Sequence, residues 1–418
     1  MGKWIIGSVL LVVALITACT PRSGAIEKPE ANTKAAPRVA VASSAKKPSM
    51  SSWPIFRGDS HATGVANSTL PKKPELVWKF EVERGAFEGT AAIVGGVAYI
   101  GDLDGTVYAF ELKTGNKKWE TNFSNKAWTF PDGKPVGKED KTEISGFMAS
   151  PSYRDGRLYI GDMFGRFFCL DAQDGKPLWG YEAQAEIDAG SNFYKGNILF
   201  GSQDATLYCL NAKNGKEIWK HQIEDQIRCS PTIVGDRTFV AGCDSRLHII
   251  DLVKGKAVDG VDIESPTMVT PAVLGDNIYF GTEGGVLFCI NWKDAKTEWT
   301  YADPERSQSM RSSPAITKTH VIFGGRSKRL YALDPTTGKE LWTFAAKGGI
   351  DSSPVIVGDR VFVGSSDGRI YGLTVAKGEK VWEYEAGGDF TASPAVADGY
   401  LVIASNRGTV YCFGERKK

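Results

Sequence analysis

A repeated unit of about 40 residues constrains the fold of this chain more than any other feature of its sequence. Successive copies follow one another at steps of 40 residues, except for one step of 43 and one of 60. The eight copies begin at Gly89, Ala149, Ala189, Cys229, Val269, Ser312, Ser352 and Ala392. A fixed period of this length indicates an array in which each unit stacks on its neighbours.

Each copy has the pattern of four short β-strands. In residues 352–386, β-branched and aromatic runs are separated by turns such as Gly358-Asp359 and Asp367-Gly368. The connections are too short for crossovers, so the strands are antiparallel. One such sheet cannot bury both faces alone, but a ring of sheets packed face to face can. The sequence therefore predicts an all-β fold, an eight-bladed β-propeller.

A column of tryptophans supports the ring. A flat, amphipathic indole suits the wedge between adjacent blades, where its N–H can still reach a carbonyl. Copy four has Asp259 in this position, which predicts the weakest outer edge. The column consists of Trp119, Trp179, Trp219, Trp299, Trp342 and Trp382.

The two ends of the repeat region complete one blade. The eighth copy stops after its third strand, residues 409–413. The missing fourth strand is found at residues 76–80, where Trp78 continues the tryptophan column. Joining the first and last segments closes the ring and removes an exposed edge. Eight blades follow by counting, with seven blades and spare strands as the alternative.

The N-terminus has the pattern of a secretion signal. Lys3 precedes an apolar stretch, residues 4–16, that is too short for a comfortable membrane span and fits a signal peptide. The stretch ends in LITAC at residues 15–19, which resembles the lipobox of bacterial lipoproteins. That resemblance implies a lipid anchor on Cys19; an ordinary signal peptide with a chance cysteine is the alternative. Thr20, where an aspartate would retain the protein at the inner membrane, favours the periplasmic side of the outer membrane.

The predicted domain organisation has three parts. Residues 1–18 are a signal peptide. Residues 19–50 are rich in Ala, Pro, Ser and Lys, bury too little apolar surface to fold, and are predicted to be a flexible tether. Residues 51–418 are the propeller, with an insertion at 124–146.

Composition excludes two classes of partner. Fifty Lys and Arg against 49 Asp and Glu leave a formal charge of +1, so no net field attracts nucleic acid. Seven Cys and four His show no metal-ligand spacing, so no metal site is predicted.

Four cysteines share one third-strand position and are expected to be small buried packing residues: Cys169, Cys209, Cys289 and Cys412.

Two segments carry a family resemblance. LDPTTGKELW at residues 333–342 and LDAQDGKPLW at residues 170–179 resemble the pyrroloquinoline-quinone (PQQ) repeat, A-x-D-x-x-T-G-x-x-x-W. The resemblance covers residues 53–414, and WPIFRGD at residues 53–59 resembles the start of such proteins. Two classes share this fold: quinoprotein alcohol dehydrogenases, and BamB-like lipoproteins that act as scaffolds in outer-membrane β-barrel assembly.

The two classes differ in the site residues that the resemblance implies. The dehydrogenases have two adjacent cysteines over the quinone, Ca²⁺ held by carboxylate and amide oxygens, and an aspartate base. This chain has no adjacent cysteines and is short for that class. We therefore expect no PQQ or Ca²⁺ and a monomeric, non-enzymatic, BamB-like scaffold. Its partner would be a membrane protein or protein complex at the outer membrane. A PQQ-dependent dehydrogenase and a propeller with an unknown ligand are the alternatives.

Partner binding is predicted at one face of the ring. One residue stands just before each inner strand, and eightfold geometry turns this column into a ring around the channel mouth. As a set these residues are too mixed for a metal cage and suit partner recognition; a solvated rim is the alternative. They are Glu88, Met148, Asp188, Arg228, Met268, Arg311, Asp351 and Thr391.

The insertion is predicted to lie on the same face. It carries Trp128 and Phe130, and loops of this length are usually functional or disordered. Nearby, the turn of blade two has Met163 and Phe164 where other blades have polar residues, which indicates an interface. The alternative is that the insertion folds over these two side chains.

Cys229 and Cys243 form a candidate disulfide in the first hairpin of blade four. If the two residues lie directly opposite one another, their Cα atoms are close enough for a bond. If they are one residue out of register, their side chains point to opposite faces. The sequence leaves both registers open.

Overall fold

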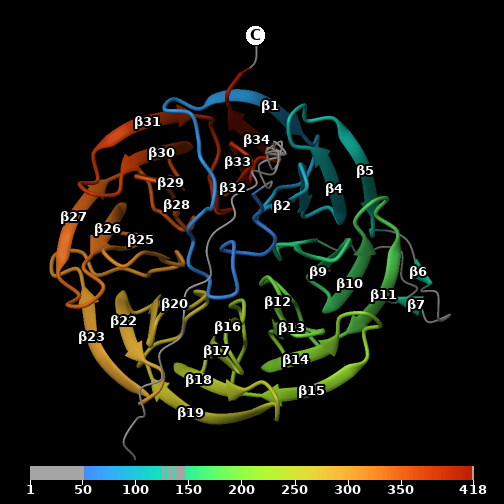
Figure 1. Cartoon of the computed structure of the whole chain (residues 1–418), viewed down its shortest axis with the longest axis horizontal. Coiled ribbons are helices and arrows are strands. Elements are labelled where there is room, and N and C mark those ends of the chain that lie inside the picture. Colours follow the sequence, from blue (N-terminus) through green and yellow to red (C-terminus); the bar gives the residue numbers. More distant parts are fainter. Residues whose placement is uncertain (1–50, 125–127, 130–134, 137–145, 417–418) are drawn as a thin grey trace, which may run out of the picture. The chain divides into compact units, whose positions relative to one another are not determined.

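The computed structural model describes residues 51–124, 128–129, 135–136 and 146–416. These residues form eight four-stranded antiparallel sheets arranged as blades around a ring (Figure 1). The predicted eight-bladed propeller is therefore confirmed, and seven blades with spare strands is excluded. In the described part of the chain, no helix is long and apolar enough to cross a membrane.

Each blade is a meander that runs outward from the central axis. Blades one to four consist of β2 (Ala92–Val94), β3 (Val97–Gly101), β4 (Thr106–Glu111) and β5 (Lys117–Asn122); β8 (Ser152–Arg154), β9 (Arg157–Gly161), β10 (Arg166–Asp171) and β11 (Pro177–Glu182); β12 (Asn192–Tyr194), β13 (Asn197–Ser202), β14 (Thr206–Asn211) and β15 (Glu217–Gln222); and β16 (Thr232–Val234), β17 (Arg237–Ala241), β18 (Arg246–Asp251) and β19 (Lys256–Asp262).

Blades five to eight follow the same plan. They consist of β20 (Ala272–Leu274), β21 (Asn277–Gly281), β22 (Val286–Asn291) and β23 (Lys296–Ala302); β24 (Ala315–Ile316), β25 (Val321–Gly325), β26 (Arg329–Leu333) and β27 (Glu340–Ala345); β28 (Val355–Val357), β29 (Arg360–Gly364), β30 (Arg369–Thr374) and β31 (Lys380–Glu385); and β32 (Ala395–Ala397), β33 (Tyr400–Ser405), β34 (Thr409–Gly414) and β1 (Glu75–Glu81). A small hairpin of β6 (Trp128–Thr129) and β7 (Pro135–Val136) lies within the insertion.

The ring closes where the sequence predicts. β1 pairs antiparallel with β34, and Trp78 lies opposite Cys412. The Trp78 indole N–H donates to the carbonyl oxygen of Leu112 in blade one at 2.8 Å. The outer strand of the last blade thus comes from the start of the propeller and joins blade eight to blade one.

The tryptophan column forms a repeated contact between neighbouring blades. Every indole in it donates to a backbone carbonyl of the next blade, with N···O distances from 2.8 to 3.2 Å. A small third-strand residue lies opposite each tryptophan. The four third-strand cysteines are among these residues and are fully buried, as predicted: Cys169, Cys209, Cys289 and Cys412.

Blade four shows how the missing tryptophan is replaced. Asp259 lies opposite Ile249, so the third strand here carries a larger side chain than its counterparts. Trp292, from the β22–β23 turn of blade five, packs on Phe239 of β17 with ring centroids 5.6 Å apart. An indole is therefore present at this interface but comes from the opposite blade.

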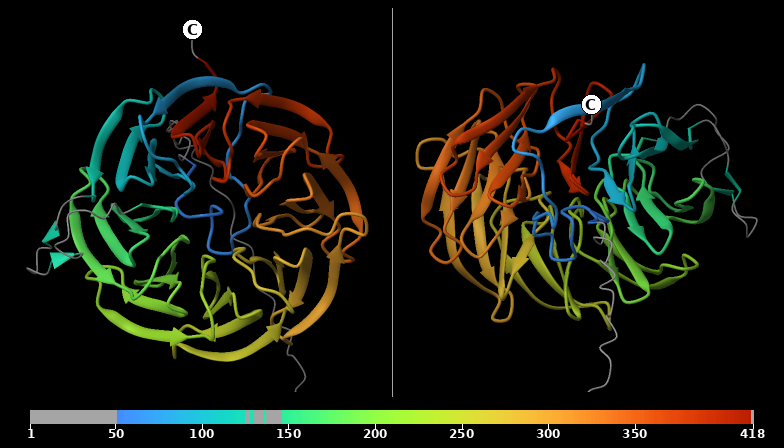
Figure 2. Two further views of the ribbon diagram at one scale, coloured as in Figure 1. Left: turned by 180° about the vertical axis from the view of Figure 1, so that it is seen from behind. Right: turned by 45° about the horizontal axis from the view of Figure 1, so that its top comes forward.

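Residues 53–66, the N-terminal segment, run around the inside of the ring (Figure 2). Backbone hydrogen bonds of 2.7–2.9 Å join the segment to the inner strands of six blades, through Ile93, Tyr153, Ile233, Val273, Ile316 and Ile356. Each partner stands five residues after the predicted mouth residue of its blade.

Candidate functional site

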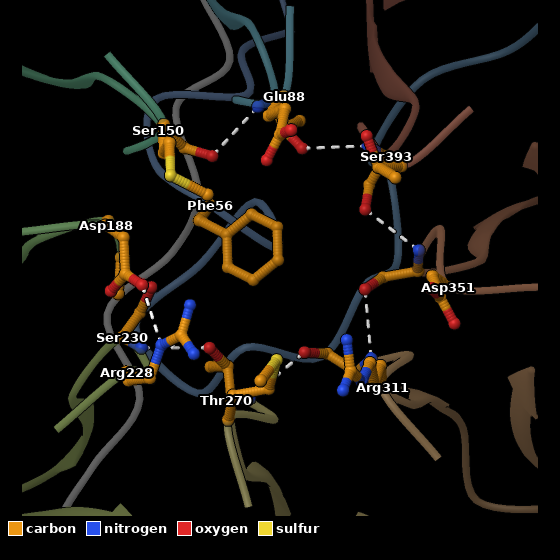
Figure 3. Close-up of a pocket in the computed structure, with 18 of the residues that line it drawn as sticks. Phe56, Glu88, Ser150, Asp188, Arg228, Ser230, Thr270, Arg311, Asp351 and Ser393 are labelled. Carbon is orange, nitrogen blue, oxygen red and sulfur yellow. Dashed lines mark hydrogen bonds and ion pairs between the residues drawn. The ribbon is translucent and has the colours of Figure 1, made fainter. Parts of the chain in front are cut away.

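The predicted column forms one ring at the channel mouth, called here the inner ring. All eight residues line a single cavity of about 420 Å³, the axial cup (Figure 3). Thr391 is exposed and the other seven are half-buried. The sequence thus predicted the placement of Glu88, Met148, Asp188, Arg228, Met268, Arg311, Asp351 and Thr391 correctly.

A second ring lies two residues further along each inner strand. Six links run around it, in which the backbone N–H of one blade donates to the hydroxyl of the next at 2.8–3.2 Å. This hydroxyl ring consists of Thr90, Ser150, Ser230, Thr270, Ser313, Ser353 and Ser393. This ring was not among the predicted features, although the sequence carries its signal: Ser, Thr or Gly recurs two positions after every inner-ring residue.

Gly190 interrupts the hydroxyl ring in blade three, and Phe56 of the N-terminal segment passes this position. A Cβ on Gly190 would lie 3.1 Å from the Phe56 Cβ, tighter than an ordinary contact. The Phe56 ring lies inside the circle of cup residues (Figure 3). The glycine therefore makes room for an aromatic side chain on the floor of the cup.

Arg57 anchors this floor from within the protein. Its side chain is only 1% exposed, and Nη2 donates to the carbonyl oxygens of Pro314 at 3.1 Å and Pro354 at 2.6 Å. Burial lowers the pKa of Arg57 to about 9, so the guanidinium is still charged at neutral pH. The N-terminal segment thus ties blades six and seven together beneath the cup.

Three ion pairs surround the mouth. Arg228 Nε lies 2.8 Å from Asp188 Oδ2, and Arg311 Nε lies 2.8 Å from Glu283 Oε1. The third pair joins Arg326 Nη2 to Asp351 Oδ2 at 2.9 Å. Glu283 and Arg326 belong to the turns between second and third strands and were not among the predicted site residues.

Glu88 and Asp188 are the electrostatically strained members of the inner ring. Burial raises the pKa of Glu88, and repulsion by Asp188 raises it further, against the attraction of Arg228. Burial also raises the pKa of Asp188, although Arg228 opposes the shift. Among the described residues, the Glu88 carboxylate has no ion-pair partner. The cup therefore holds an uncompensated acidic group on the side of blades one to three.

The apolar turn of blade two borders the same mouth. Phe164 is 42% exposed, and the Arg166 guanidinium lies 5.6 Å from its ring centroid. Met163 is half-buried, and its N–H donates to the carbonyl of Gly146 at 3.0 Å. For the predicted insertion residues, Trp128 lies in strand β6 and Phe130 lies outside the described residues.

The candidate disulfide is absent from the structure, because Cys229 and Cys243 are both free thiols. β16 pairs with β17 so that Thr232 lies opposite Phe239. The pairing ends there, so neither cysteine lies within it, and the Cys243 N–H donates to the carbonyl oxygen of Gln226 at 3.0 Å. Cys229 is buried, and Cys243 is partly exposed beside Arg228.

The arrangement defines a class of protein: a closed eight-bladed propeller of PQQ-like repeats, with one face hollowed by a polar cup. A family model described as "Outer membrane protein assembly factor BamB" matches residues 124–189, 183–317 and 311–413, more than half of the chain. The chain belongs to this family.

Solved structures with the same fold come from both functional classes. BamB from Moraxella catarrhalis is 18% identical, with a TM-score of 0.66, over 82% of this chain and 98% of that one. Quinohemoprotein alcohol dehydrogenase from Comamonas testosteroni is 15% identical, with a TM-score of 0.71, over 88% of this chain and 81% of that one. At these identities both likenesses establish the fold alone.

One dehydrogenase is also similar in sequence over a short stretch. The 1-butanol dehydrogenase (cytochrome c) of Thauera butanivorans is 27% identical over 110 residues. The match covers 26% of this chain and 14% of that protein. The similarity therefore joins a small part of this chain to a small part of that protein.

Proposed function

We propose that this protein is a non-enzymatic scaffold on the periplasmic side of the outer membrane. It binds a membrane protein or protein complex there and contributes to the assembly of outer-membrane β-barrels. The observation that carries the proposal is the match of residues 124–413 to a family model, which is described as an outer membrane protein assembly factor. The mouth of the propeller suits this role because paired charges alternate there with apolar side chains, a mixture typical of protein interfaces.

The chemistry of the cup does not fit PQQ, which is an anionic tricarboxylate. Arg228, Arg311 and Arg326 are already paired, and within the described ranges the charged lining group without an ion-pair partner is the Glu88 carboxylate. No two cysteines of the chain are adjacent. Within the described ranges, no three His, Cys, Asp or Glu side chains form a group that could hold a metal ion. These features favour the scaffold over the dehydrogenase.

Crosslinking in intact cells, followed by purification and mass spectrometry, tests the scaffold role. We expect recovery of an outer-membrane barrel protein together with assembly factors. Recovery of a cytochrome instead would contradict the proposal. So would alcohol-dependent dye reduction by the purified protein with PQQ and Ca²⁺, above a boiled control.

The proposed lipid anchor gives a separate prediction. Cys19→Ser removes the acylated thiol, so the variant is expected to lose incorporation of a palmitate analogue and to leave the membrane fraction. Cys412→Ser is the matched control, because that thiol is fully buried in the propeller. Labelling of Cys19→Ser at the level of the control would contradict the lipoprotein assignment.

A further inference from the structure

The charges on one side of the axial cup do not balance. Glu88 and Asp188 are two carboxylates, and Arg228 is the single cation whose field reaches both of them. Glu186 adds a third carboxylate beside Asp188, and the buried Arg57 adds a second cation beneath the floor, 5.9 Å from the Phe56 ring centroid, so these charges together sum to one negative charge. On the other side, Arg311 is matched by Glu283 and Arg326 by Asp351. Counted over the residues that the structure describes, the cup therefore lacks one positive charge near Glu88 and Asp188.

In the described part of the chain, the Asp188 carboxylate has hydrogen-bond donors on one of its two oxygens and none on the other. Its side chain is 6% exposed, and Oδ2 accepts from Arg228 Nε at 2.8 Å and from Gln203 Nε2 at 3.1 Å. Oδ1 is buried and has no hydrogen-bond partner among the described residues. Burying part of a carboxylate without a partner is costly unless a donor satisfies it.

The rest of the lining suits a cation carried on an aliphatic stem. The Phe56 ring lies within the cup beside Glu88 and Asp188 (Figure 3), and the face of an aromatic ring attracts a cation. Met148 lines the cup between the two acidic blades. Lysine and arginine side chains pack their methylene groups on such apolar surface while the charged end binds elsewhere.

We propose that the axial cup binds the charged end of a lysine or arginine side chain presented by a partner protein. The ammonium or guanidinium group lies between Glu88 and Asp188 and over the Phe56 ring, and its stem crosses Met148. This inference rests on the proposed function as a protein-binding scaffold and names the chemistry that the scaffold recognises.

Cys243 provides the readout for a test on the full chain. Of the cysteines in the described ranges it is the partly exposed one, the others being buried, and it lies near Arg228. The probes are acetylated, amidated tripeptides with a central lysine, arginine or norleucine between glycines, together with free n-butylammonium and Ca²⁺. Alkylation of Cys243 is followed by peptide mapping, and affinity is measured by calorimetry.

We expect the lysine and arginine peptides to slow alkylation of Cys243 and the norleucine peptide to leave it unchanged. Glu88→Gln keeps the shape of the side chain and removes its charge. It should lower the affinity for the lysine and arginine peptides at least about tenfold, the equivalent of one charge-assisted contact. Phe56→Leu should weaken them less, because it removes only the ring. Glu182→Gln, an exposed acid on β11, is the matched control and should leave affinity unchanged.

Three results would overturn the inference. The norleucine peptide could bind as tightly as the lysine peptide, or Glu88→Gln could bind like the wild type. Alternatively, n-butylammonium or Ca²⁺ could bind more tightly than either basic peptide, which would assign the cup to a small free cation. If Glu88→Gln still recovers the crosslinked barrel partners while the basic peptides fail to bind wild type, the scaffold role stands and the cup inference alone fails.

Discussion

Replacing Trp78 by alanine is expected to lower the free energy of unfolding by on the order of 3–5 kcal/mol, the usual loss for a buried aromatic side chain. Trp78 is 8% exposed and packs against Phe110 of blade one, with ring centroids 5.7 Å apart. Its N–H also donates to Leu112, so truncation leaves that carbonyl without its partner. Chemical denaturation followed by tryptophan fluorescence and circular dichroism measures the loss.

Two further variants separate ring closure from the loss of one side chain. Trp119→Ala removes an indole from the same column but at an interface within the continuous chain, so its cost should not exceed that of Trp78→Ala. Replacing residues 75–81 by a Gly-Ser stretch of equal length removes all of β1 and should lower the melting temperature by many degrees. A melting temperature within a degree or two of wild type for the β1 replacement would contradict closure through this strand.

Much of the fold follows from the sequence because the repeat is nearly translational. A residue such as Arg228 occupies the same place in its copy as Asp188 and Met268, so counting alone places it at the mouth. The same counting located β1 in blade eight, since Trp78 has the pattern of the other outer-strand tryptophans. Because the period is nearly constant, the place of a residue in one blade predicts the place of its counterpart in the next, without knowledge of tertiary contacts.

Features that depart from the repeat were not predictable in this way. The N-terminal segment has no counterpart in any blade, so nothing in the spacing places Phe56 in the cup or Arg57 beneath it. Trp292 stands in a turn position that other blades fill with Leu, Ala, Pro or Val, and its packing against Phe239 depends on the absence of a tryptophan at Asp259. Each of these contacts joins parts of the chain whose relation appears only when the ring is closed.

The register of the Cys229 hairpin was undetermined for a different reason. The turn near Gly235 fixes which residues face one another, and a shift of one position exchanges the two faces of a strand. The structure sets Val234 opposite Arg237, a two-residue turn, and the pairing ends at Thr232 and Phe239, before it reaches either cysteine. Residue types around the turn permit either register, so the sequence left both open.

Arg57→Ala is expected to lower the free energy of unfolding by on the order of 3–5 kcal/mol, as much as Trp78→Ala. The alanine leaves a cavity in a site that is fully buried, and it removes the donor of the Pro314 and Pro354 carbonyls. Those prolines immediately precede β24 and β28, so the loss is transmitted to the inner strands of two blades. Equilibrium denaturation measures the change, and hydrogen exchange at Ile316 and Ile356 shows whether the N-terminal segment has detached.

Arg57→Met is the informative companion, because it keeps most of the volume and removes the charge. Burying a guanidinium has a desolvation cost that an apolar side chain avoids, so the methionine variant should lose clearly less stability than the alanine variant. The difference between them isolates the packing contribution, and the remaining loss in Arg57→Met reports on the two carbonyl hydrogen bonds. If Arg57→Ala unfolds at the same denaturant concentration as wild type, with unchanged exchange at Ile316 and Ile356, then Arg57 does not anchor the N-terminal segment in the channel.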